Sequence, residues 1–286
     1  MRQDNDSLAK SYEKCKELNK RFGKSYYYST YLLPKASRKY IHSLYAFCRY
    51  ADDIVDDFDP SDLASRRERL KKFGDDFYRD LQVGRSSDVI LKAVVNTVKE
   101  FDIDKVLFDK FLFSMEMDFT KTRYETYDDL LVYMEGSAAV IGEMTLPVLE
   151  PSSKYAREPA RQLGFAFQLT NFIRDVEEDL KRGRIYLPLE DIEKFGAIDD
   201  IIRNNNSDKV KELVAFEITR AQEHYSESLL GDVYLPPRSA ACVQAARQLY
   251  SGILEEVEKA DYKIFGKRAT VSMYKKLKTA ARTVLL

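Results

Sequence analysis

Acidic residues recur at intervals of three and four in one segment of the sequence, residues 45–57. Side chains at this spacing lie on one face of a helix. That face would carry Tyr45, Arg49, Asp52, Asp53 and Asp56. Carboxylates gathered in this way could hold a divalent cation, or they could form a solvated acidic surface. Because so short a motif arises by chance in a chain with 47 Asp and Glu residues, this segment alone leaves both interpretations open.

A second segment has its polar residues one helical turn apart, at Gln168, Asn171, Asp175 and Asp179. Steps of four residues rotate by only about 40° on a helix, so these side chains face the same way. The residues before them, Leu163–Phe167, are apolar, small or aromatic, which is typical of a buried helix. Unpaired carboxylates beside such a run are costly unless a cation neutralises them. The second segment therefore favours a cation site.

Two such helices together indicate a particular chemistry. Mg²⁺ prefers oxygen ligands and commonly binds a few carboxylates together with substrate phosphate oxygens. Opposed acidic faces in a helical bundle could therefore hold Mg²⁺ and a diphosphate between them. Arg49 and Arg174, each near an Asp, could bind the negative charge of a leaving diphosphate. The 19 Tyr and 16 Phe residues suit a carbocation, because aromatic faces attract positive charge.

Helical periodicity surrounds both segments and extends over almost the whole chain. Gly and Pro are scarce, with 11 and 8 residues, which favours long helices with few turns. Pro34 and Asp59-Pro60 flank the helix that would carry the first acidic face. The sequence predicts helices at about 7–22, 35–58, 62–82, 87–100, 105–121, 127–149, 156–182, 208–229, 238–262 and 268–284.

The breaks between these helices are short, and most are polar. Two of them are apolar instead, Gly183–Pro188 after its basic start and Val233–Pro237. Strand-like alternation bounded by turn signals is hard to find. No linker, repeat or low-complexity tract divides the chain. We therefore expect residues 1–286 to form one all-α domain.

Charge and absent motifs exclude several classes of function. The 46 basic and 47 acidic residues give a net charge of −1, which offers no electrostatic reason to expect nucleic acid as a partner. Neither the dinucleotide loop G-x-G-x-x-G nor the Walker-type phosphate loop is present, so bound phosphates would depend on metal and side chains. Two His and three separate Cys argue against a multi-histidine metal site, a zinc knuckle or a disulfide framework.

The sequence gives no sign of a targeting or membrane-spanning segment. Residues 1–10 are polar and acidic. The longest apolar stretch, Ala138–Leu149, contains Glu143 and is too short to span a bilayer. We expect a soluble cytoplasmic protein.

At full length, the two acidic segments are YAFCRYADDIVDD and QLTNFIRDVEEDLKRGRIYLP. They resemble the two signature segments of the squalene/phytoene synthase family, and the second is long and specific. The resemblance extends over nearly the whole chain, to Phe22–Ser25, residues 133–142, Asp261-Tyr262 and residues 267–272. It implies an all-α isoprenoid-synthase helical bundle with a central cavity. It also implies a requirement for Mg²⁺ and head-to-head joining of two prenyl diphosphates.

The same resemblance implies roles for particular residues. The residues implied in metal binding are Asp52, Asp56, Asn171, Asp175 and Asp179, with Asp53 in support. Those implied in catalysis are Tyr45, Arg49, Asp52, Asp56 and Asp175. Those implied in substrate binding are Phe22, Gly23, Lys24, Ser25, Tyr45, Arg49, Gln168, Arg174 and Tyr262. About two or three Mg²⁺ ions would bind together with the substrate diphosphate. Asp57 lies outside the shared motif and is expected at the surface.

The reaction implied by the resemblance has two halves. One allylic substrate loses diphosphate with the help of Mg²⁺ and Arg49, and the double bond of the other attacks the cation. Loss of a proton then closes a cyclopropylcarbinyl diphosphate. A second ionisation, a rearrangement and another proton loss would give a hydrocarbon such as phytoene. The protein would exclude water, position the chains and stabilise charge.

Several features favour phytoene synthesis from geranylgeranyl diphosphate, without NADPH, within this family. Squalene synthases carry YCHY before the VAG of the middle helix with a catalytic tyrosine last, and that position is Gly136 here. A membrane tail is also missing, and GRIYLP resembles phytoene synthases. Synthesis of dehydrosqualene, presqualene diphosphate or squalene from farnesyl diphosphate stays open, because the depth of the pocket decides chain length.

Functions from other classes are also considered. A head-to-tail prenyltransferase or a terpene cyclase would share the fold and the use of Mg²⁺. The former would carry a second DDxxD, whereas the spacing here is Asp175-x-x-x-Asp179. A non-catalytic prenyl-diphosphate-binding protein would be expected to have lost an acidic face, and both faces are present. No obligatory protein partner is inferred. Because the implied product is insoluble in water, transient contact with a membrane surface is a further hypothesis.

The remaining polar residues of interest have ordinary structural interpretations. Cys48 is expected to be a core thiol, His42 a structural residue and His224 a solvated one. The cluster Tyr26–Tyr28 could line a pocket or pack in the core. Arg268 and Lys275 lie in a run that is most simply a solvated face, and they could also contact diphosphate or anionic lipid.

Overall fold

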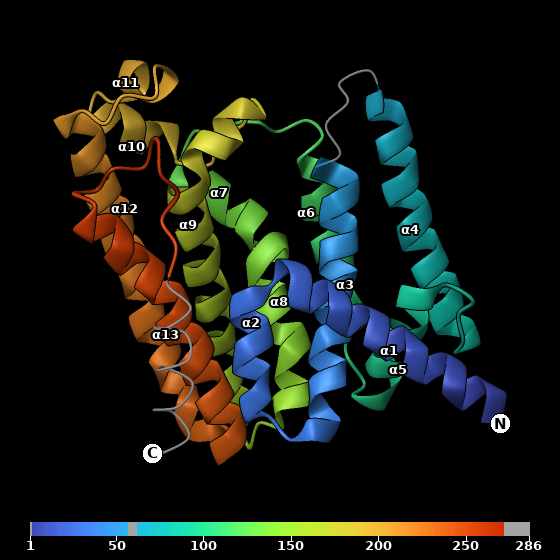
Figure 1. Cartoon of the computed structure of the whole chain (residues 1–286). Helices are drawn as coiled ribbons and strands as arrows, with labels where there is room; N and C mark the ends of the chain where they lie inside the picture. Colours follow the sequence, from blue (N-terminus) through green and yellow to red (C-terminus); the bar gives the residue numbers. More distant parts are fainter. Residues whose placement is uncertain (1, 57–61, 272–286) are drawn as a thin grey trace.

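The computed structural model describes residues 2–56 and 62–271, with the backbone alone for residues 2–6. Within these ranges the chain folds into helices without a β-strand, and Arg123 and Ile185 form an isolated bridge (Figure 1). The prediction of an all-α fold is confirmed. None of the described helices has the length and apolar character needed to cross a membrane.

The bundle is built from long helices joined by short turns. The longer helices are α1 (Arg2–Phe22), α3 (Lys35–Asp56), α4 (Leu63–Val83), α5 (Val89–Glu100), α6 (Lys105–Met117), α9 (Arg157–Lys181), α12 (Asp208–Ser228) and α13 (Pro237–Lys259). The shorter ones are α2 (Lys24–Ser29), α7 (Tyr127–Met134), α8 (Val140–Thr145), α10 (Leu189–Lys194) and α11 (Ile198–Ile202). The 3-10 turns are η1 (Thr30–Leu32), η4 (Leu146–Leu149), η5 (Lys154–Ala156) and η6 (Leu229–Tyr234), and η3 (Glu135–Ala139) is a π turn.

Side-chain caps determine where several helices begin. Asp88 accepts hydrogen bonds from the backbone N–H groups of Ile90 and Leu91 at the start of α5. Thr126 and Asp129 form a capping box at the start of α7. These caps satisfy backbone donors that the first helical turn leaves without partners.

Two large hydrophobic clusters form the interior. One is built mainly from α7, α9, α12 and α13, and the other mainly from α1, α3, α4, α5, α6 and α8. They correspond to the left and right parts of the bundle in Figure 1. This division matters for function, because the large cavity described below is lined by members of both clusters.

Helices α3 and α9 carry the two acidic segments, and they run in the same direction. Each begins near the lower end of the bundle in Figure 1 and ends in its upper half. The acidic residues lie in the C-terminal halves of both helices, so both acidic faces are brought to the same end of the molecule. A parallel pair at this distance in sequence is a tertiary arrangement that periodicity does not specify.

Most predicted helix bounds are confirmed to within a few residues, and several are corrected. The predicted helix at 127–149 is wrong as one element, because it divides into α7, η3, α8 and η4. Helices α2, α10 and α11 were not predicted. Part of the apolar loop expected at Val233–Pro237 belongs to η6. Of the helix predicted at 268–284, residues 268–271 are not helical and the remainder lies outside the described residues.

The π turn η3 interrupts the helix that faces the cavity. Its residues follow α7 and precede α8 without a loop, so the backbone stays helical but gains a wider turn. Such turns are common at functional sites because they change which side chains face inward. Here Ser137 and Ala138, on the π turn itself, line the cavity.

His42 on α3 is buried, hydrogen-bonded to Asn19 and stacked on Tyr27, which confirms its structural role. Burial lowers the pKa of His42 to about 4, and the nearby charges of Lys16 and Arg38 act in the same direction. Because the folded pKa lies below the ordinary value of about 6.5, the neutral ring contributes stability above that value. This contribution is lost as the pH falls from about 6.5 through about 4.

We therefore expect the free energy of unfolding to fall by about 3 kcal/mol over this pH window because of His42 alone. The measurement is denaturant unfolding across the window for the wild-type protein and His42→Gln. The two curves should converge as the pH falls, since the variant lacks the titrating ring. Curves that stay parallel would contradict the assignment.

Candidate active site

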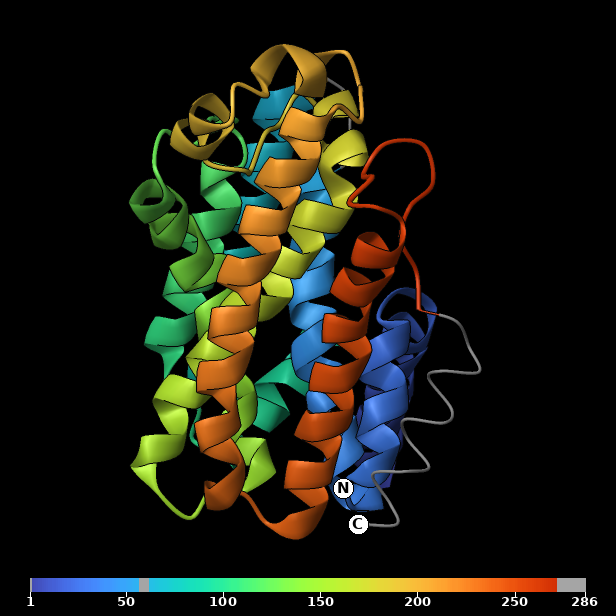
Figure 2. The ribbon, with the colours of Figure 1, turned by 90° about the vertical axis from the view of Figure 1, so that its left-hand side faces the viewer.

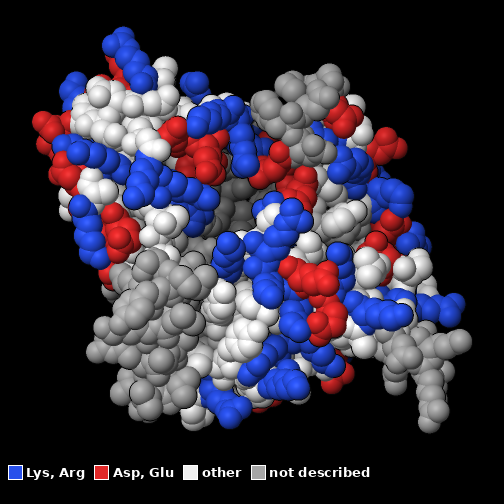
Figure 3. Space-filling view, in the orientation of Figure 1, with Lys and Arg blue, Asp and Glu red and all other residues white. Residues whose placement is uncertain are grey.

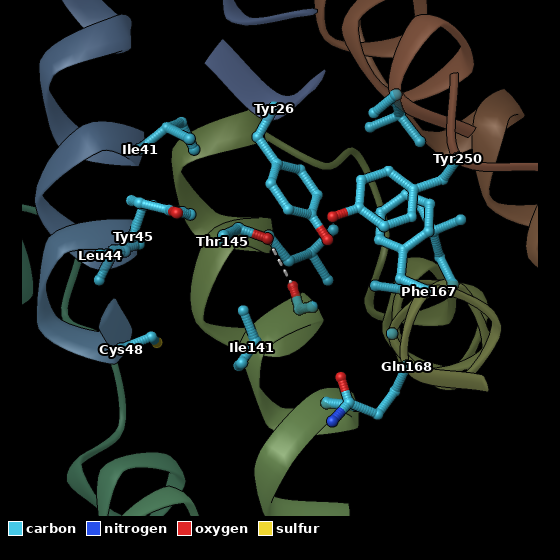
Figure 4. Close-up of a pocket in the computed structure, with 18 of the residues that line it drawn as sticks. Tyr26, Ile41, Leu44, Tyr45, Cys48, Ile141, Thr145, Phe167, Gln168 and Tyr250 are labelled. Atoms are coloured by element: carbon cyan, nitrogen blue, oxygen red, sulfur yellow. Dashed lines mark hydrogen bonds between the residues drawn. The ribbon is translucent and has the colours of Figure 1, made fainter. Parts of the chain in front are cut away.

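A cavity of about 420 Å³ lies between the two hydrophobic clusters. Helices α2, α3, α8, α9 and α13 and the π turn contribute its walls. Figure 4 shows Ile41, Leu44, Tyr45 and Cys48 of α3 on one side, with Phe167 and Gln168 of α9 and Tyr250 of α13 opposite. The ring of Tyr26 from α2 lies between the two sides.

On α3 and α9 the lining residues are spaced by about three or four residues, so they lie on one face of each helix. Each of these two helices therefore forms one wall of the cavity. On α3 they are Ile41, Leu44, Tyr45, Cys48, Arg49 and Asp52. On α9 they are Pro159, Ala160, Leu163, Gly164, Phe167, Gln168, Asn171 and Arg174. From Pro159 to Arg174 the α9 wall is about 22 Å long at 1.5 Å per residue. Both walls change from apolar to charged toward the C-terminal ends of their helices.

The charged end of the cavity begins with Asp52 and Asp56 on α3. Burial raises the pKa of Asp52 to about 7, and the neighbouring Asp56 carboxylate contributes to the increase. Asp56 accepts hydrogen bonds from Arg182 and Arg184, at 3.0 and 2.9 Å. These arginines follow α9, so the ion pairs join the ends of the two acidic helices.

The C-terminal end of α9 likewise carries carboxylates that are buried or paired with arginines. Asp175 accepts hydrogen bonds from the adjacent Arg174, at 2.8 and 2.6 Å, and from Arg268, at 2.7 Å. Burial raises the pKa of Asp179 to about 7, and Asp175 and Asp56 both contribute to the increase. Asp56 therefore acts on carboxylates of both helices, as expected if the two acidic faces oppose each other. In the space-filling view, a hollow on this face is bordered by acidic and basic side chains (Figure 3).

These side chains fit a cation that binds together with a diphosphate. The donors are carboxylate oxygens and the amide of Asn171, whose Oδ1 is buried and has no hydrogen-bond partner. Burial first and neighbouring carboxylates second raise the pKa of Asp52 and of Asp179, so a bound cation would favour the ionised form of both side chains. In the described ranges, no three His, Cys, Asp or Glu side chains gather closely enough to hold a metal ion by themselves. Mg²⁺ with additional phosphate oxygens as ligands matches this donor set.

Aromatic rings cover the apolar walls of the cavity. Tyr26 stacks on Tyr250 with ring centroids 4.8 Å apart, and Phe167 lies 4.5 Å from Tyr250. Tyr45 lies 6.2 Å from Tyr26 on the opposite side. Burial raises the pKa of Tyr45, so its hydroxyl stays protonated at neutral pH. Such a wall attracts a developing positive charge through its π faces while excluding water.

A buried polar network beside the cavity was not predicted from the sequence. Tyr133 lines the cavity and donates a hydrogen bond of 2.8 Å to Asp118, which also accepts one of 3.0 Å from Tyr186. Burial raises the pKa of Asp118 to about 6, although Arg184 opposes this increase. Arg184 binds both Asp56 and the backbone carbonyl of Asp118, and thereby joins the network to the acidic end. In the sequence, this network is indicated by the segments that hold Tyr133, Arg184 and Tyr186, YMEG at residues 133–136 and GRIYLP at residues 183–188.

The structure brings six of the predicted site residues to the cavity wall: Tyr45, Arg49, Asp52, Gln168, Asn171 and Arg174. Asp53, Asp56, Asp175 and Asp179 lie beside that end without lining the cavity. Asp53 is exposed and paired with Arg49.

The predicted residues Phe22–Ser25 lie where α1 ends and α2 begins, and none of them lines the cavity. Phe22 is exposed and its ring lies 4.5 Å from the Arg49 guanidinium. Gly23 packs so closely that a Cβ atom would lie 2.6 Å from both Asn19 and the Tyr45 ring. Lys24 is exposed and Ser25 half-buried, and neither lines the cavity. Tyr262 lies beyond α13 at a positive φ of 56°, half-buried against the core.

The structure also tests the other residues of interest. Cys48 is buried, as predicted, and its side chain lines the cavity. His224 is not simply solvated, because it is half-buried and hydrogen-bonded to Tyr127 and Gln162. Tyr26 lines the cavity whereas Tyr27 is buried in the core. Arg268 contacts Asp175, while Asp57 and Lys275 lie outside the described residues.

Comparisons with known proteins agree with this geometry. The model of the squalene/phytoene synthase family matches residues 19–275. A 15-cis-phytoene synthase of Synechocystis sp. is 34% identical, over 95% of this chain and 83% of its own length. A phytoene synthase of Arthrospira platensis is also 34% identical, over 93% of this chain and 90% of its own length.

Solved structures give the same family likeness. A dehydrosqualene synthase crystallised with a ligand has a TM-score of 0.90 at 27% identity, covering 99% of this chain and 98% of the other. The squalene synthase HpnC from Alicyclobacillus acidocaldarius has a TM-score of 0.81 at 27% identity, covering 90% of this chain and 97% of the other. The predicted isoprenoid-synthase bundle is confirmed.

Proposed function

The chain belongs to the squalene/phytoene synthase family, and we propose on that basis that it joins two geranylgeranyl diphosphates head to head to form phytoene. It is a prenyltransferase. The relatives named phytoene synthase are more similar in sequence, at 34%, than the dehydrosqualene and squalene synthases of known structure, at 27%. This difference supports the twenty-carbon substrate.

One observation carries the proposal. A long, aromatic-lined cavity ends at two facing acidic helices, so one space offers an apolar site for prenyl chains and a charged site for diphosphate. A prenyl diphosphate has the same division into apolar and charged parts. Two such substrates lying side by side would place both diphosphates near Asp52 and Arg174 and both chains along α3 and α9.

The proposed metal ligands are Asp52, Asp56, Asn171, Asp175 and Asp179, with Asp53 in support. Bound Mg²⁺ would neutralise the diphosphate and make it a better leaving group. Arg49 and Arg174 would hold diphosphate oxygens by charge-assisted hydrogen bonds. Arg174 and Arg268 now bind Asp175, so substrate and cation binding would redistribute these ion pairs.

The chain's own residues would control the cation that follows. Tyr26, Tyr45, Phe167 and Tyr250 would face it with π surfaces and keep water out of the cavity. Gln168, one turn from Asn171, would orient the diphosphate end of one chain. Phe22, Gly23, Lys24, Ser25 and Tyr262 are also proposed to contact substrate. Gly23 packs against Tyr45 and Phe22 against Arg49, so these two would in addition position the side chains of the wall.

A fifteen-carbon substrate is the second candidate. The favouring observation is the dehydrosqualene synthase, whose fold matches at a TM-score of 0.90 over 99% of this chain. With farnesyl diphosphate, the same steps would give a thirty-carbon product, dehydrosqualene, or stop at presqualene diphosphate.

The proposed setting is the cytoplasm, with transient contact at a membrane surface. Cys15, Cys48 and Cys242 are all free thiols, which suits a reducing compartment. The membrane contact is proposed because the product would be a hydrocarbon with no polar group. The proposed small-molecule partners are the prenyl diphosphates.

The deciding experiment is product analysis by mass spectrometry. The purified protein would be incubated with Mg²⁺ and either geranylgeranyl or farnesyl diphosphate, without NADPH. An Asp52→Asn/Asp175→Asn double variant serves as the control. We expect a forty-carbon hydrocarbon from geranylgeranyl diphosphate that the double variant does not make. A thirty-carbon product from farnesyl diphosphate alone would replace the first candidate with the second, and no product from either would overturn both.

A further inference from the structure

The end of the cavity opposite the acidic residues is closed by a small apolar cluster. Leu33, Leu149 and Cys242 are its buried members, and Ile41, Leu235 and Val243 pack against them half-buried. All six side chains also line the cavity. We call this cluster the floor. Its side chains come from segments that lie far apart in the sequence.

Next to the floor, η5 and η6 form one surface, and they also contribute Ala156, Gly231 and Asp232 to the cavity wall. The backbone carbonyl of Tyr234 accepts hydrogen bonds from both the backbone N–H and the hydroxyl of Ser152, at 2.8 and 3.0 Å. Tyr155 and Tyr234 place their ring centroids 6.4 Å apart. Figure 2 shows the α12–α13 connection and the segment before α9 next to each other at the lower end of the bundle. The acidic ends of α3 and α9 lie toward the other end.

This surface exposes an unusual amount of apolar side chain. Val233, Leu230 and Tyr155 are the three most exposed large apolar side chains in the described part of the chain, at 79%, 69% and 67%. Leu229, beside them on η6, is exposed at 53%. We call Tyr155, Leu229, Leu230 and Val233 the end patch. Apolar groups gathered at a protein surface mark sites of contact with another apolar phase.

The one charged residue of η6 is turned away from the end patch. Asp232 accepts hydrogen bonds of 2.7 and 2.9 Å from the buried Arg247 and one of 3.1 Å from Gln244. Arg247 also binds Ser228 at the end of α12. These contacts keep the carboxylate of Asp232 inward, where it lines the cavity, while the aliphatic side chains of η6 are exposed. The apolar exposure is therefore a built feature of the turn.

Among apolar partners, a lipid bilayer fits the shape and composition of the end patch best. The end patch consists of aliphatic and aromatic tips on two short turns, which suits insertion among lipid chains better than a flat protein interface. Tyr155 and Tyr234 have the amphipathic rings favoured at a membrane interface, and exposed Lys154 and Arg238 flank them. Exposed Glu150, Glu158 and Glu227 lie in the same segments, so apolar insertion would have to supply the binding energy.

We infer that the end patch docks on a lipid bilayer and that the hydrocarbon product leaves the cavity through the floor into that bilayer. The exit route rests on the proposed function, whereas the docking surface does not. A hydrocarbon that crosses from the cavity through Leu33, Leu149 and Leu235 never meets water, and its transfer retains the burial of its apolar surface. The opposite exit leads past arginines and carboxylates into solvent.

The test uses vesicles of phosphatidylcholine, alone or mixed with phosphatidylglycerol, and a flotation assay. The variant is Leu229→Ser/Leu230→Ser/Val233→Ser, whose side chains do not line the cavity. The matched control is Phe113→Ser/Val132→Ser, which removes side chains of similar exposure, 62% and 59%, from α6 and α7. Diphosphate release in detergent confirms that each protein is folded and competent.

The wild-type protein and the control should float with both kinds of vesicle and continue to do so at high salt. The end-patch variant should bind at least tenfold more weakly, because three apolar insertions are lost. It should also release less hydrocarbon into vesicles than the control at equal turnover in detergent. Equal flotation of both variants, or flotation lost at high salt, would overturn the docking surface. So would a wild-type dimer that the end-patch variant loses without any vesicle binding. Flotation without any hydrocarbon from the wild type would overturn the proposed function and leave the docking surface standing.

Discussion

Replacement of Asp52 by Asn is expected to lower kcat for hydrocarbon formation by about 10³-fold, with the protein still folded. Asp52 lines the charged end of the cavity, where the first diphosphate would depart. The amide keeps the size of the side chain and removes the negative charge of a proposed Mg²⁺ ligand, so the variant would hold more weakly the cation that would stabilise the leaving diphosphate. The measurement is steady-state turnover at saturating Mg²⁺ and substrate.

Stability separates this effect from a structural one. Burial and Asp56 raise the pKa of Asp52, so its ionised form destabilises the folded state at neutral pH. Asp52→Asn should therefore unfold at an equal or higher denaturant concentration than the wild type. The matched control is Asp75→Asn on α4, where the carboxylate is exposed and paired with Lys71. Turnover of the control should be unchanged, and a loss of stability in Asp52→Asn would contradict a primarily catalytic role.

Gly142→Ala is expected to destabilise the protein by about 3 kcal/mol. A Cβ atom at this position on α8 would lie 2.2 Å from the backbone carbonyl oxygen of Ala160 on α9. The backbone carbonyl of Ala160 cannot change rotamer as a side chain can, so α8 and α9 would have to move apart to relieve the overlap. Both helices line the cavity, and turnover should fall together with stability. Denaturant unfolding gives the free energy and a product assay gives the turnover.

Gly74→Ala is the control for this substitution. Gly74 is also inside a helix, α4, but the nearest atom to its Cβ would be the terminal Cδ1 of Leu112 at 3.1 Å. That methyl group can move slightly, and Ala is favoured over Gly in a helix by roughly 0.5–1 kcal/mol. Gly74→Ala should therefore be neutral or stabilising. Equal losses in the two variants would show that close contact between α8 and α9 is not the cause.

The acidic faces could be predicted because a helix converts spacing in sequence directly into shared direction. Asn171, Asp175 and Asp179 lie on one side of α9 whatever surrounds them. That α3 and α9 run parallel and bring Asp56 close to Asp179 depends on contacts between segments more than a hundred residues apart. Periodicity within either helix contains no information about the other, so the opposition of the two faces was a hypothesis from their shared chemistry, which the family resemblance then supported.

The polar network around Asp118 could not be predicted for the same reason. Asp118, Tyr133 and the segment that holds Arg184 and Tyr186 come from three separate parts of the chain, and each residue alone resembles an ordinary residue of its segment. The π turn was missed for a different reason. Its residues Glu135–Ala139 continue the helical pattern of 127–149 without a Pro or a turn signal, and only the backbone hydrogen bonds distinguish a wider turn.

The π turn has a consequence for how this chain tolerates insertions and deletions. A π turn holds one residue more than an α-helical turn, so deleting one residue between Glu135 and Ala139 could restore a continuous α-helix. Because the wider turn already accommodates the extra residue, such a deletion would leave the residues after it on nearly the same face, whereas a one-residue deletion inside α7 would rotate them by about 100°. Ile141 and Thr145 would leave the cavity wall after the deletion in α7, whereas they would stay in it after a deletion in the π turn. The shape of the cavity is therefore set by the number of residues in this helix as well as by their identities.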